Sequence, residues 1–490
     1  MRFFSNFLEA RRELKESNAV KFHSHSFPVD MPEIQENWNT PITEASLLAR
    51  ASVLMRFGQL DLESGTGAFH VNLMLRTIGD MIGVRVRPNV MLTTLEASFS
   101  DGNESRTEII ELPTVSTSTR RVWYMEYATD WLAVSLGKPR VYDISPVERF
   151  LDIMPAEPEQ RIPTVGEILE RLEKIEYASK PYTFTQHGIA AAVACASFAF
   201  LLGGGIYDVV AAFLGAFAGQ TLRSFMQRRH YTQYATTAFV VLLAGFVAIG
   251  FLRLASFIDP SALSHDTAYI GAMLFALPSF PFITGGMDVA KLDYLSAVQR
   301  WTHSLVVMVV ATMAAWGVAA TINLNPEEFV RSDLPVALLI AMRFAASFTG
   351  VFFYSLMVNS HPRMALVSAG IAAIANTIRL ELIDFTPLVP AAAAFVAATL
   401  VGLLATLWKK LAEDDYISQK LSFPHHALTI PAIAIMVPGF YMYQAMYNLG
   451  SMHIDLALDW IFRAAMVAIA LPAGLAFSRF LSARRWRYEL

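Results

Sequence analysis

Ten apolar segments occupy most of the chain beyond residue 186, and each is about as long as a helix that crosses a lipid bilayer. A helix needs about 20 mostly apolar residues to span the hydrocarbon core. The segments cover residues 186–204, 206–223, 234–256, 267–287, 302–321, 335–358, 363–380, 388–408, 427–448 and 455–478. The sequence therefore predicts an α-helical polytopic membrane protein with about ten spans.

Charged residues are distributed unevenly along the chain. Asp, Glu, Lys and Arg number 46 in residues 1–180 but 34 in residues 181–490. The first part has the composition and length of a water-soluble domain, whereas the second suits a membrane. We therefore expect a soluble domain over residues 1–185 and membrane units over residues 186–333 and 334–490. The formal net charge of -4 argues against a general nucleic-acid-binding protein.

The soluble part shows both helical and strand-like patterns, which predict an α/β or α+β domain. Thr164 and Glu167 have the spacing of a capping box at the start of a helix. Predicted helices cover residues 43–57, 66–82, 145–154 and 164–177, and predicted strands lie within residues 84–99, 106–113 and 120–127.

Positive charges between the spans predict the orientation of the chain, because Lys and Arg favour the cytosolic side. If the soluble domain is cytosolic, only Arg253, Arg331 and Arg379 fall in outer loops, and most of the others fall inside. The single cysteine, Cys195, allows no intrachain disulfide, and the N-terminus does not resemble a signal peptide. We expect a multi-pass protein of the cytoplasmic (inner) membrane with both termini in the cytosol.

The two membrane units resemble each other at a spacing of 153 residues. This spacing pairs Pro278 with Pro431, Gly286 with Gly439 and Tyr294 with Tyr447. Because each unit holds five spans, the second would enter the membrane from the opposite side. The pattern predicts two inverted five-helix repeats, with a site where broken helices of the two halves meet.

Four stretches resemble the threonine/serine exporter family, and the resemblance covers nearly the whole chain. They are residues 62–95, 277–300, 344–379 and 430–449; the second contains Pro278, Pro281, Asp288 and Asp293, and the last contains Pro438–Gly439 and several tyrosines. Ser279 replaces a family glycine, and Ala434–Ile435 replace an earlier Pro-Gly pair. The resemblance implies a ten-span exporter of threonine and serine with a cytosolic N-terminal domain.

Polar residues within apolar segments are the candidate transport residues, because they are costly in lipid. Asp288 could carry a proton or hold a substrate ammonium group, and Arg343 could hold a carboxylate. The alternatives are a solvated carboxylate for Asp288, and a structural ion pair for Arg343. The positions that we expect to bind substrate or couple protons are Asp288, Pro278, Pro281, Thr284, Gly285, Gly286, Arg343, Asn376, Pro438, Gly439, Tyr441, Tyr443 and Gln444.

No cofactor, metal or nucleotide site is expected. His425 and His426 are adjacent, so their side chains point in different directions, and no recognised ligand spacing accompanies them. Residues 64–69 lack the Lys-Ser/Thr ending of a phosphate-binding loop. We therefore do not expect an enzyme. With the family resemblance, we expect a secondary exporter of threonine and serine that is driven by protons. The sequence is also compatible with a homo-oligomer. The alternatives are a transporter or channel for another small metabolite, and a membrane-anchored enzyme or sensor acting through residues 1–185.

Overall fold

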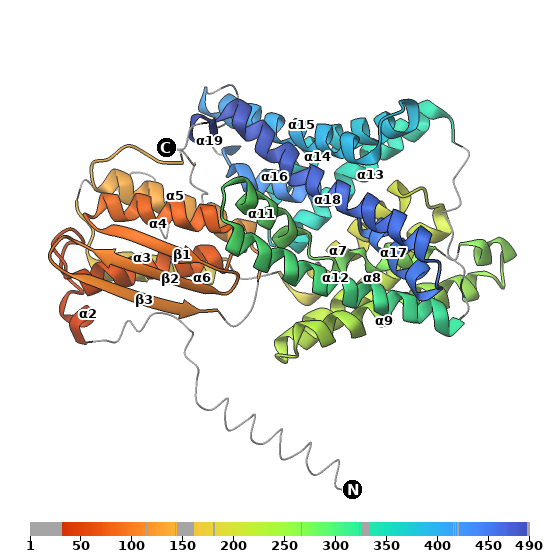
Figure 1. Cartoon of the computed structure of the whole chain (residues 1–490), viewed down its shortest axis with the longest axis horizontal. Helices are drawn as coiled ribbons and strands as arrows, with labels where there is room; N and C mark the ends of the chain where they lie inside the picture. Colours follow the sequence, from red (N-terminus) through yellow and green to blue (C-terminus); the bar gives the residue numbers. More distant parts are fainter. Residues whose placement is uncertain are drawn as a thin grey trace, which may run out of the picture.

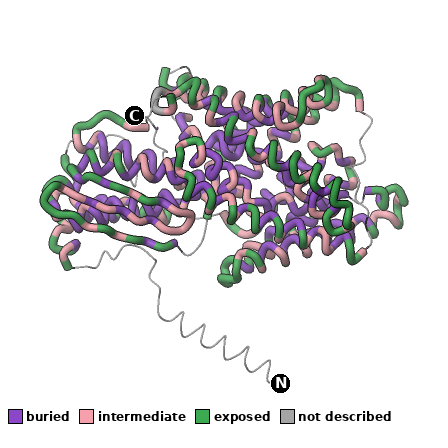
Figure 2. Tube along the Cα trace, viewed as in Figure 1, coloured by how far each residue is buried: buried purple, intermediate pink, exposed green. Residues whose placement is uncertain are grey.

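The computed structural model describes residues 32–112, 116–142, 144, 161–179, 182–265, 267–322, 324, 334–414, 416, 418 and 421–487. An N-terminal α/β region lies at one end of the molecule, and a larger helical region forms the rest (Figure 1). Buried residues run through the interior of both regions, and exposed residues lie mainly along their outer faces (Figure 2).

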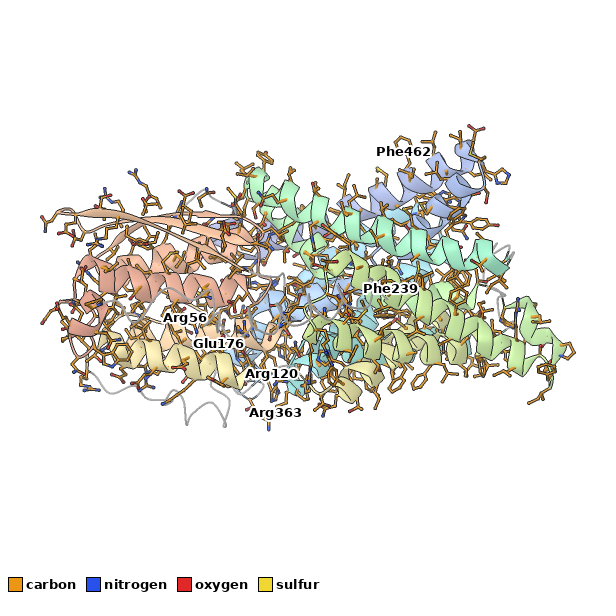
Figure 3. The ribbon with its side chains drawn as sticks, turned by 90° about the horizontal axis from the view of Figure 1, so that it is seen from below. Arg56, Arg120, Glu176, Phe239, Arg363 and Phe462 are labelled. Atoms are coloured by element: carbon orange, nitrogen blue, oxygen red, sulfur yellow. The ribbon has the colours of Figure 1, made fainter. Side chains whose placement is uncertain are left out.

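The N-terminal region is a three-stranded antiparallel sheet packed with helices. The strands pair in the order β1 (Arg85–Val90), β2 (Thr94–Ser100) and β3 (Ser105–Glu111). Helix α3 (Leu47–Leu62) is buried along nearly its whole length because it contacts the sheet and four other helices. The other helices are α2 (Pro32–Glu36), α4 (Ala68–Met81), α5 (Thr119–Ser135) and α6 (Val165–Ala178). An ion pair between Arg56 and Glu176 links α3 to α6 (Figure 3).

Most of the elements predicted for this region are confirmed. Residues 43–57 and 66–82 correspond to α3 and α4, and residues 84–99 hold two strands, β1 and β2. Thr164 caps α6 by accepting a hydrogen bond from the Glu167 amide, at 3.2 Å. The Glu167 carboxylate pairs instead with Arg161 and Arg171, so only half of the predicted capping box forms.

One prediction for this region is wrong. Residues 120–127 belong to helix α5, not to a strand, and the helix from Val122 to Ala133 is buried on all sides. A helix buried all round shows no amphipathic period, and the aromatic residues of this segment also favour a strand. The helix predicted over residues 145–154 lies outside the described residues.

Within the described residues, eight helices are long and apolar enough to cross a membrane, and two further pairs of helices each form a bent unit. The eight are α7 (Phe184–Leu201), α8 (Ile206–Arg228), α9 (Gln233–Ala255), α12 (Tyr294–Ile322), α13 (Val336–Met357), α14 (Pro362–Phe385), α15 (Pro390–Glu413) and α18 (Ile454–Ser482). Large apolar side chains such as Phe239 and Phe462 are exposed on this region (Figure 3). The chain is thus a multi-pass membrane protein, with up to ten spans if each bent pair is one span.

The bent pairs fall on the two segments that contain the helix-breaking prolines. Helix α10 (Ala268–Met273) continues as a 3₁₀ turn (Leu274–Ala276) and then bends by 61° into α11 (Ser279–Ala290). Helix α16 (His425–Ala434) bends by 41° into α17 (Gly439–Gly450).

The two bent pairs correspond at a spacing of 160 residues, not 153. Pro278 and Pro438 each precede the second helix of their pair, and Leu292 and Met452 both adopt positive φ in the following turn. Pro431, which the sequence comparison paired with Pro278, lies inside α16. The 153-residue spacing therefore pairs Pro278 with a residue inside a helix, whereas Pro278 and Pro438, at the two bends, are 160 residues apart.

The N-terminal region packs against the ends of several helices of the helical region. The hydroxyl groups of Thr119 and Ser360 lie 2.6 Å apart, and the Tyr182 hydroxyl donates to the Ser360 carbonyl at 2.8 Å. These contacts place the start of α7 and the start of α14 beside the N-terminal region (Figure 1).

Candidate functional site

A cavity of about 480 Å³ lies where the two bent helix pairs meet. Leu277 and Ser279 line it from the first bend, and residues 434–438 line it from the second. The two bends are in direct contact, because a Cβ on Gly439 would come within 2.3 Å of the Leu277 side chain. The cavity is therefore built from residues that lie about 160 positions apart in the sequence.

Proline determines where each helix is interrupted. Pro278 and Pro438 are the residues immediately before α11 and α17. Proline suits this position because the first amides of a helix have no intrahelical partner. Pro281 falls in the first turn of α11, where its missing amide costs nothing for the same reason. The interruptions leave the carbonyl end of α16 and the amide end of α17 beside the cavity, and both ends carry partial charge.

Asn376 and Arg379 form a polar pair on the cavity wall. The Asn376 amide group donates to the Ser347 hydroxyl at 2.9 Å, and the Arg379 Nε donates to the Asn376 side-chain oxygen at 2.9 Å. Asn376 is fully buried. Arg379 makes no ion pair with any residue that the structure describes, so its positive charge is not neutralised by a neighbouring side chain.

Arg343 also lines the cavity, but two carboxylates already hold it. Its guanidinium group lies 2.8 Å from Glu381 and 2.5 Å from Asp384. Both acids belong to α14, so these ion pairs join α13 to α14. This arrangement is a structural ion pair, which was the alternative interpretation of Arg343 from the sequence.

Aromatic side chains form another part of the wall. The rings of Tyr441 and Trp460 lie 5.5 Å apart, and the Arg463 guanidinium lies 5.2 Å from the Trp460 ring centroid. Arg463 also pairs with Asp459 at 2.9 Å, in an exposed position. The cavity thus presents both arginine and aromatic side chains to a small molecule.

Asp288 lies outside the lining of this cavity, at the junction with the N-terminal region. Its carboxylate accepts a hydrogen bond from the Phe69 amide at 3.2 Å, and it lies 3.1 Å from Nε of Arg300. Asp288 and Arg300 are both almost completely buried. Asp288 therefore caps the first turn of α4 and compensates the charge of Arg300.

The neighbouring candidates in α11 serve helix packing. A Cβ on Gly285 would come within 2.9 Å of Trp301, and a Cβ on Gly286 within 2.3 Å of Pro472. These glycines allow α11 to pack closely against α12 and α18. The Thr284 hydroxyl donates to the carbonyl of Phe280 in its own helix, at 3.2 Å.

Tyr443 and Gln444 are buried beside α10 and not on the cavity wall. The Tyr443 hydroxyl is hydrogen-bonded to that of Tyr269, and its ring stacks on Tyr447 with centroids 6.2 Å apart. Of the residues expected to form one site, the structure brings Arg343, Asn376, Pro438 and Tyr441 to the cavity. It places Asp288, Thr284, Gly285 and Gly286 in the contacts described above.

Arg379 is the residue that the sequence analysis missed. The sequence assigns it to an outer loop, because it falls at the very end of the predicted span over residues 363–380. Helix α14 continues to Phe385, which keeps Arg379 within the helix, one turn after Asn376. The three-residue spacing of Asn376 and Arg379 is a signal that the sequence contained.

A multi-pass helical protein whose two interrupted helices meet at a polar cavity has the architecture of a membrane transporter. Comparison with models of protein families identifies a particular transporter family. A threonine/serine exporter model matches residues 140–323, and a second model, described as Threonine/Serine exporter, ThrE, matches residues 343–481. The chain belongs to the threonine/serine exporter family. No curated protein and no solved structure gave a significant match.

Proposed function

We propose that this protein is a secondary active exporter of threonine and serine, and that the cavity between the two bends holds the amino acid. The single observation that carries the proposal is Arg379, an arginine without an acidic partner among the described residues, on the wall of a cavity of about 480 Å³. A guanidinium group can bind a carboxylate through two parallel hydrogen bonds. The substrate ammonium would then lie near the carbonyl end of α16, and the hydroxyl near Asn376 or Tyr441.

Alternating access would arise from movement of two inverted halves around this cavity. Contacts between the halves support the idea, since α7 packs on α13, α12 packs on α17, and α11 packs on α18. If α11 corresponds to α17 and α12 to α18, the α12–α17 contact corresponds to the α11–α18 contact. A two-fold relation between the halves requires this exchange. The cavity lies near the C-terminal ends of α7 and α14, whose N-terminal ends adjoin the N-terminal region. We infer an outward-facing state, in the cytoplasmic membrane, with both termini cytosolic.

Asp288 and Arg300 would close the inner side of the transport path. Their ion pair holds α11, α12 and the first turn of α4 together at the junction. Protonation of Asp288 would remove this ion pair and weaken the closure. A proton could therefore couple to transport through the opening of the inner side, without contact between Asp288 and the substrate.

Efflux of labelled threonine from proteoliposomes tests the proposal. We expect faster efflux of threonine and serine when a pH gradient is imposed than without one. Arg379→Ala should reduce efflux, whereas Arg253→Ala, an exposed arginine at the end of α9, should not. Efflux that does not depend on the pH gradient would contradict proton coupling. Absence of threonine and serine efflux would favour another small metabolite as the substrate.

A further inference from the structure

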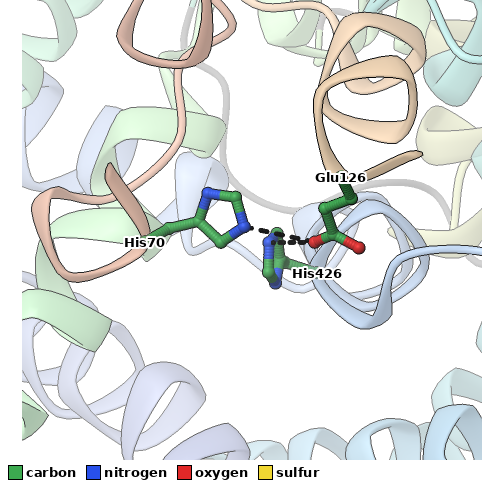
Figure 4. A group of neighbouring side chains, drawn as sticks. All are labelled: His70, Glu126 and His426. Carbon is green, nitrogen blue, oxygen red and sulfur yellow. Dashed lines mark hydrogen bonds and ion pairs between the residues drawn. The ribbon is translucent and has the colours of Figure 1, made fainter. Parts of the chain in front are cut away.

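Two histidines and a glutamate from three distant parts of the chain meet at the junction of the two regions (Figure 4). His70 lies in α4, Glu126 in α5, and His426 at the start of α16. One oxygen of Glu126 lies 3.2 Å from Nε2 of His70 and 3.2 Å from Nε2 of His426. All three potential ligand atoms lie within 4.8 Å of one another.

These separations suit a four-coordinate metal ion. Zinc binds histidine nitrogen and carboxylate oxygen at about 2.0–2.2 Å, so two ligands of a tetrahedral site lie about 3.3 Å apart. Two histidines and one carboxylate are a ligand set that zinc and iron(II) use in proteins. Three protein ligands would leave a fourth position for water.

Asp61 holds the imidazole ring of His70 in place from the side away from Glu126. The Asp61 carboxylate lies 2.7 Å from Nδ1 of His70, and both side chains are almost completely buried. An Nδ1–H that donates to Asp61 leaves the lone pair of Nε2 directed toward Glu126. Such a carboxylate partner fixes the tautomer of a ligating histidine and increases its basicity.

The charges of the cluster favour a cation at its centre. The buried carboxylates of Asp61 and Glu126 lie 2.7 Å and 3.2 Å from the two ring nitrogens of His70. Nε2 of His426 makes no hydrogen bond to any described residue, although it lies close to Glu126. A divalent ion would compensate the two buried carboxylates and occupy the lone pairs of both imidazoles.

We propose that His70, Glu126 and His426 bind a divalent transition-metal ion of the zinc class, which fastens the N-terminal region to α16. The adjacent His425 points elsewhere, since its Nε2 lies 3.2 Å from the Gly402 carbonyl oxygen. Ligand spacing in the sequence does not reveal this site, because the two ligands nearest along the chain, His70 and Glu126, are 56 residues apart. The ion would hold the start of α16, whose other end lines the cavity.

Metal content of the purified full-length protein tests this proposal independently of transport. The protein, in detergent, is stripped with a chelator, reloaded with Zn²⁺ and separated from free metal by gel filtration. We expect about one zinc ion per chain for the wild type and for the matched control His425→Ala. His70→Ala, Glu126→Gln and His426→Ala should each lose most of the bound zinc. Asp61→Asn, which keeps all three ligands, should weaken zinc binding by about 10–100-fold.

Two outcomes would overturn the proposal. One is a wild-type protein that retains no zinc, which would make the cluster a protonated histidine bound to carboxylates. The other is unchanged zinc content in His70→Ala and His426→Ala. A second measurement avoids dependence on the folding of the variants: Co²⁺ added to the stripped wild type should give the visible absorption bands of a four-coordinate site, and Zn²⁺ should abolish them.

Discussion

Two arginines on the cavity wall differ in their partners, and this difference assigns their roles. Arg343 is held by Glu381 and Asp384, whereas Arg379 donates to the neutral side chain of Asn376 and forms no ion pair with any described residue. A guanidinium group that two carboxylates already neutralise has little to gain from a third. Arg379 is therefore the better partner for the carboxylate of an amino acid.

Arg379→Ala should raise the threonine concentration that gives half-maximal transport by at least about 10-fold. The reason is that a hydrogen bond to a charged group contributes about 1.5–3 kcal/mol. Initial rates in proteoliposomes over a range of threonine concentrations measure the effect. Arg253→Ala should leave this concentration unchanged, and an unchanged value for Arg379→Ala would exclude Arg379 from the substrate site.

Asp288→Asn should destabilise the protein, because it leaves the buried Arg300 without a charged partner. Breaking one side of a buried ion pair costs about 3–5 kcal/mol. Thermal unfolding in detergent would show the change as a lower Tm. The control is Asp293→Asn, a partly exposed acid five residues away, which we expect to lower Tm much less. Equal Tm values for the two variants would contradict the structural role of Asp288.

The sequence predicted polar residues near the interrupted helices but not their partners. Asp288 follows Gly285 and Gly286, which suggested a helix end, yet the amide that it binds belongs to Phe69, which is 219 positions away. Arg379 was missed because it lies next to the predicted end of its span at residue 380, while helix α14 continues to Phe385. Long-range contacts of this kind depend on the packing of the whole chain.

At the scale of the elements, close contacts through glycine hold the bent helices in place. Gly286 meets Pro472 of α18, and Gly439 meets Leu277 at the first bend. A proline ring cannot move aside as a flexible side chain can. Gly286 therefore sets the distance between α11 and α18, and so the position of the first bend.

Gly286→Ala should lower the Tm in detergent, because its Cβ would come within 2.3 Å of a Pro472 ring carbon. Overpacking of this kind costs about 1–3 kcal/mol. Gly317→Ala in α12 is the matched control, since no atom lies within 4 Å of its added Cβ. It should leave Tm unchanged or raise it slightly, because alanine favours a helix more than glycine. A Tm for Gly286→Ala that equals the control would show that α11 and α18 are not tightly packed.

The sequence predicted the spanning helices well and the N-terminal helices less evenly. Length and hydropathy suffice for a membrane span, because lipid requires about 20 apolar residues whatever the neighbours are. They do not suffice for α5, since a helix buried on all sides shows no amphipathic period and its aromatic residues also suit a strand. The spacing of the two bends required the structure, because Pro438, and not Pro431, precedes the second helix of its pair.

At the scale of the whole molecule, the cavity and the N-terminal region lie toward opposite ends of the helices. The Asp288–Arg300 pair and the His70–Glu126–His426 cluster both lie at the junction with the N-terminal region. The junction thus concentrates the buried charges, while the cavity has the unneutralised arginine. This separation supports a division between an inner closure and a substrate site.

The most direct test of the account asks whether threonine occupies the cavity. A cysteine placed at Tyr441, in a background where the buried Cys195 is replaced by alanine, reports on the cavity through its rate of reaction with a water-soluble thiol reagent. His453→Cys, in the exposed turn between α17 and α18, is the control. Both cysteine variants must still transport threonine. If threonine and serine occupy the cavity, they should slow the labelling of Tyr441→Cys and leave the labelling rate of His453→Cys unchanged. Equal labelling of Tyr441→Cys with and without saturating threonine would contradict it.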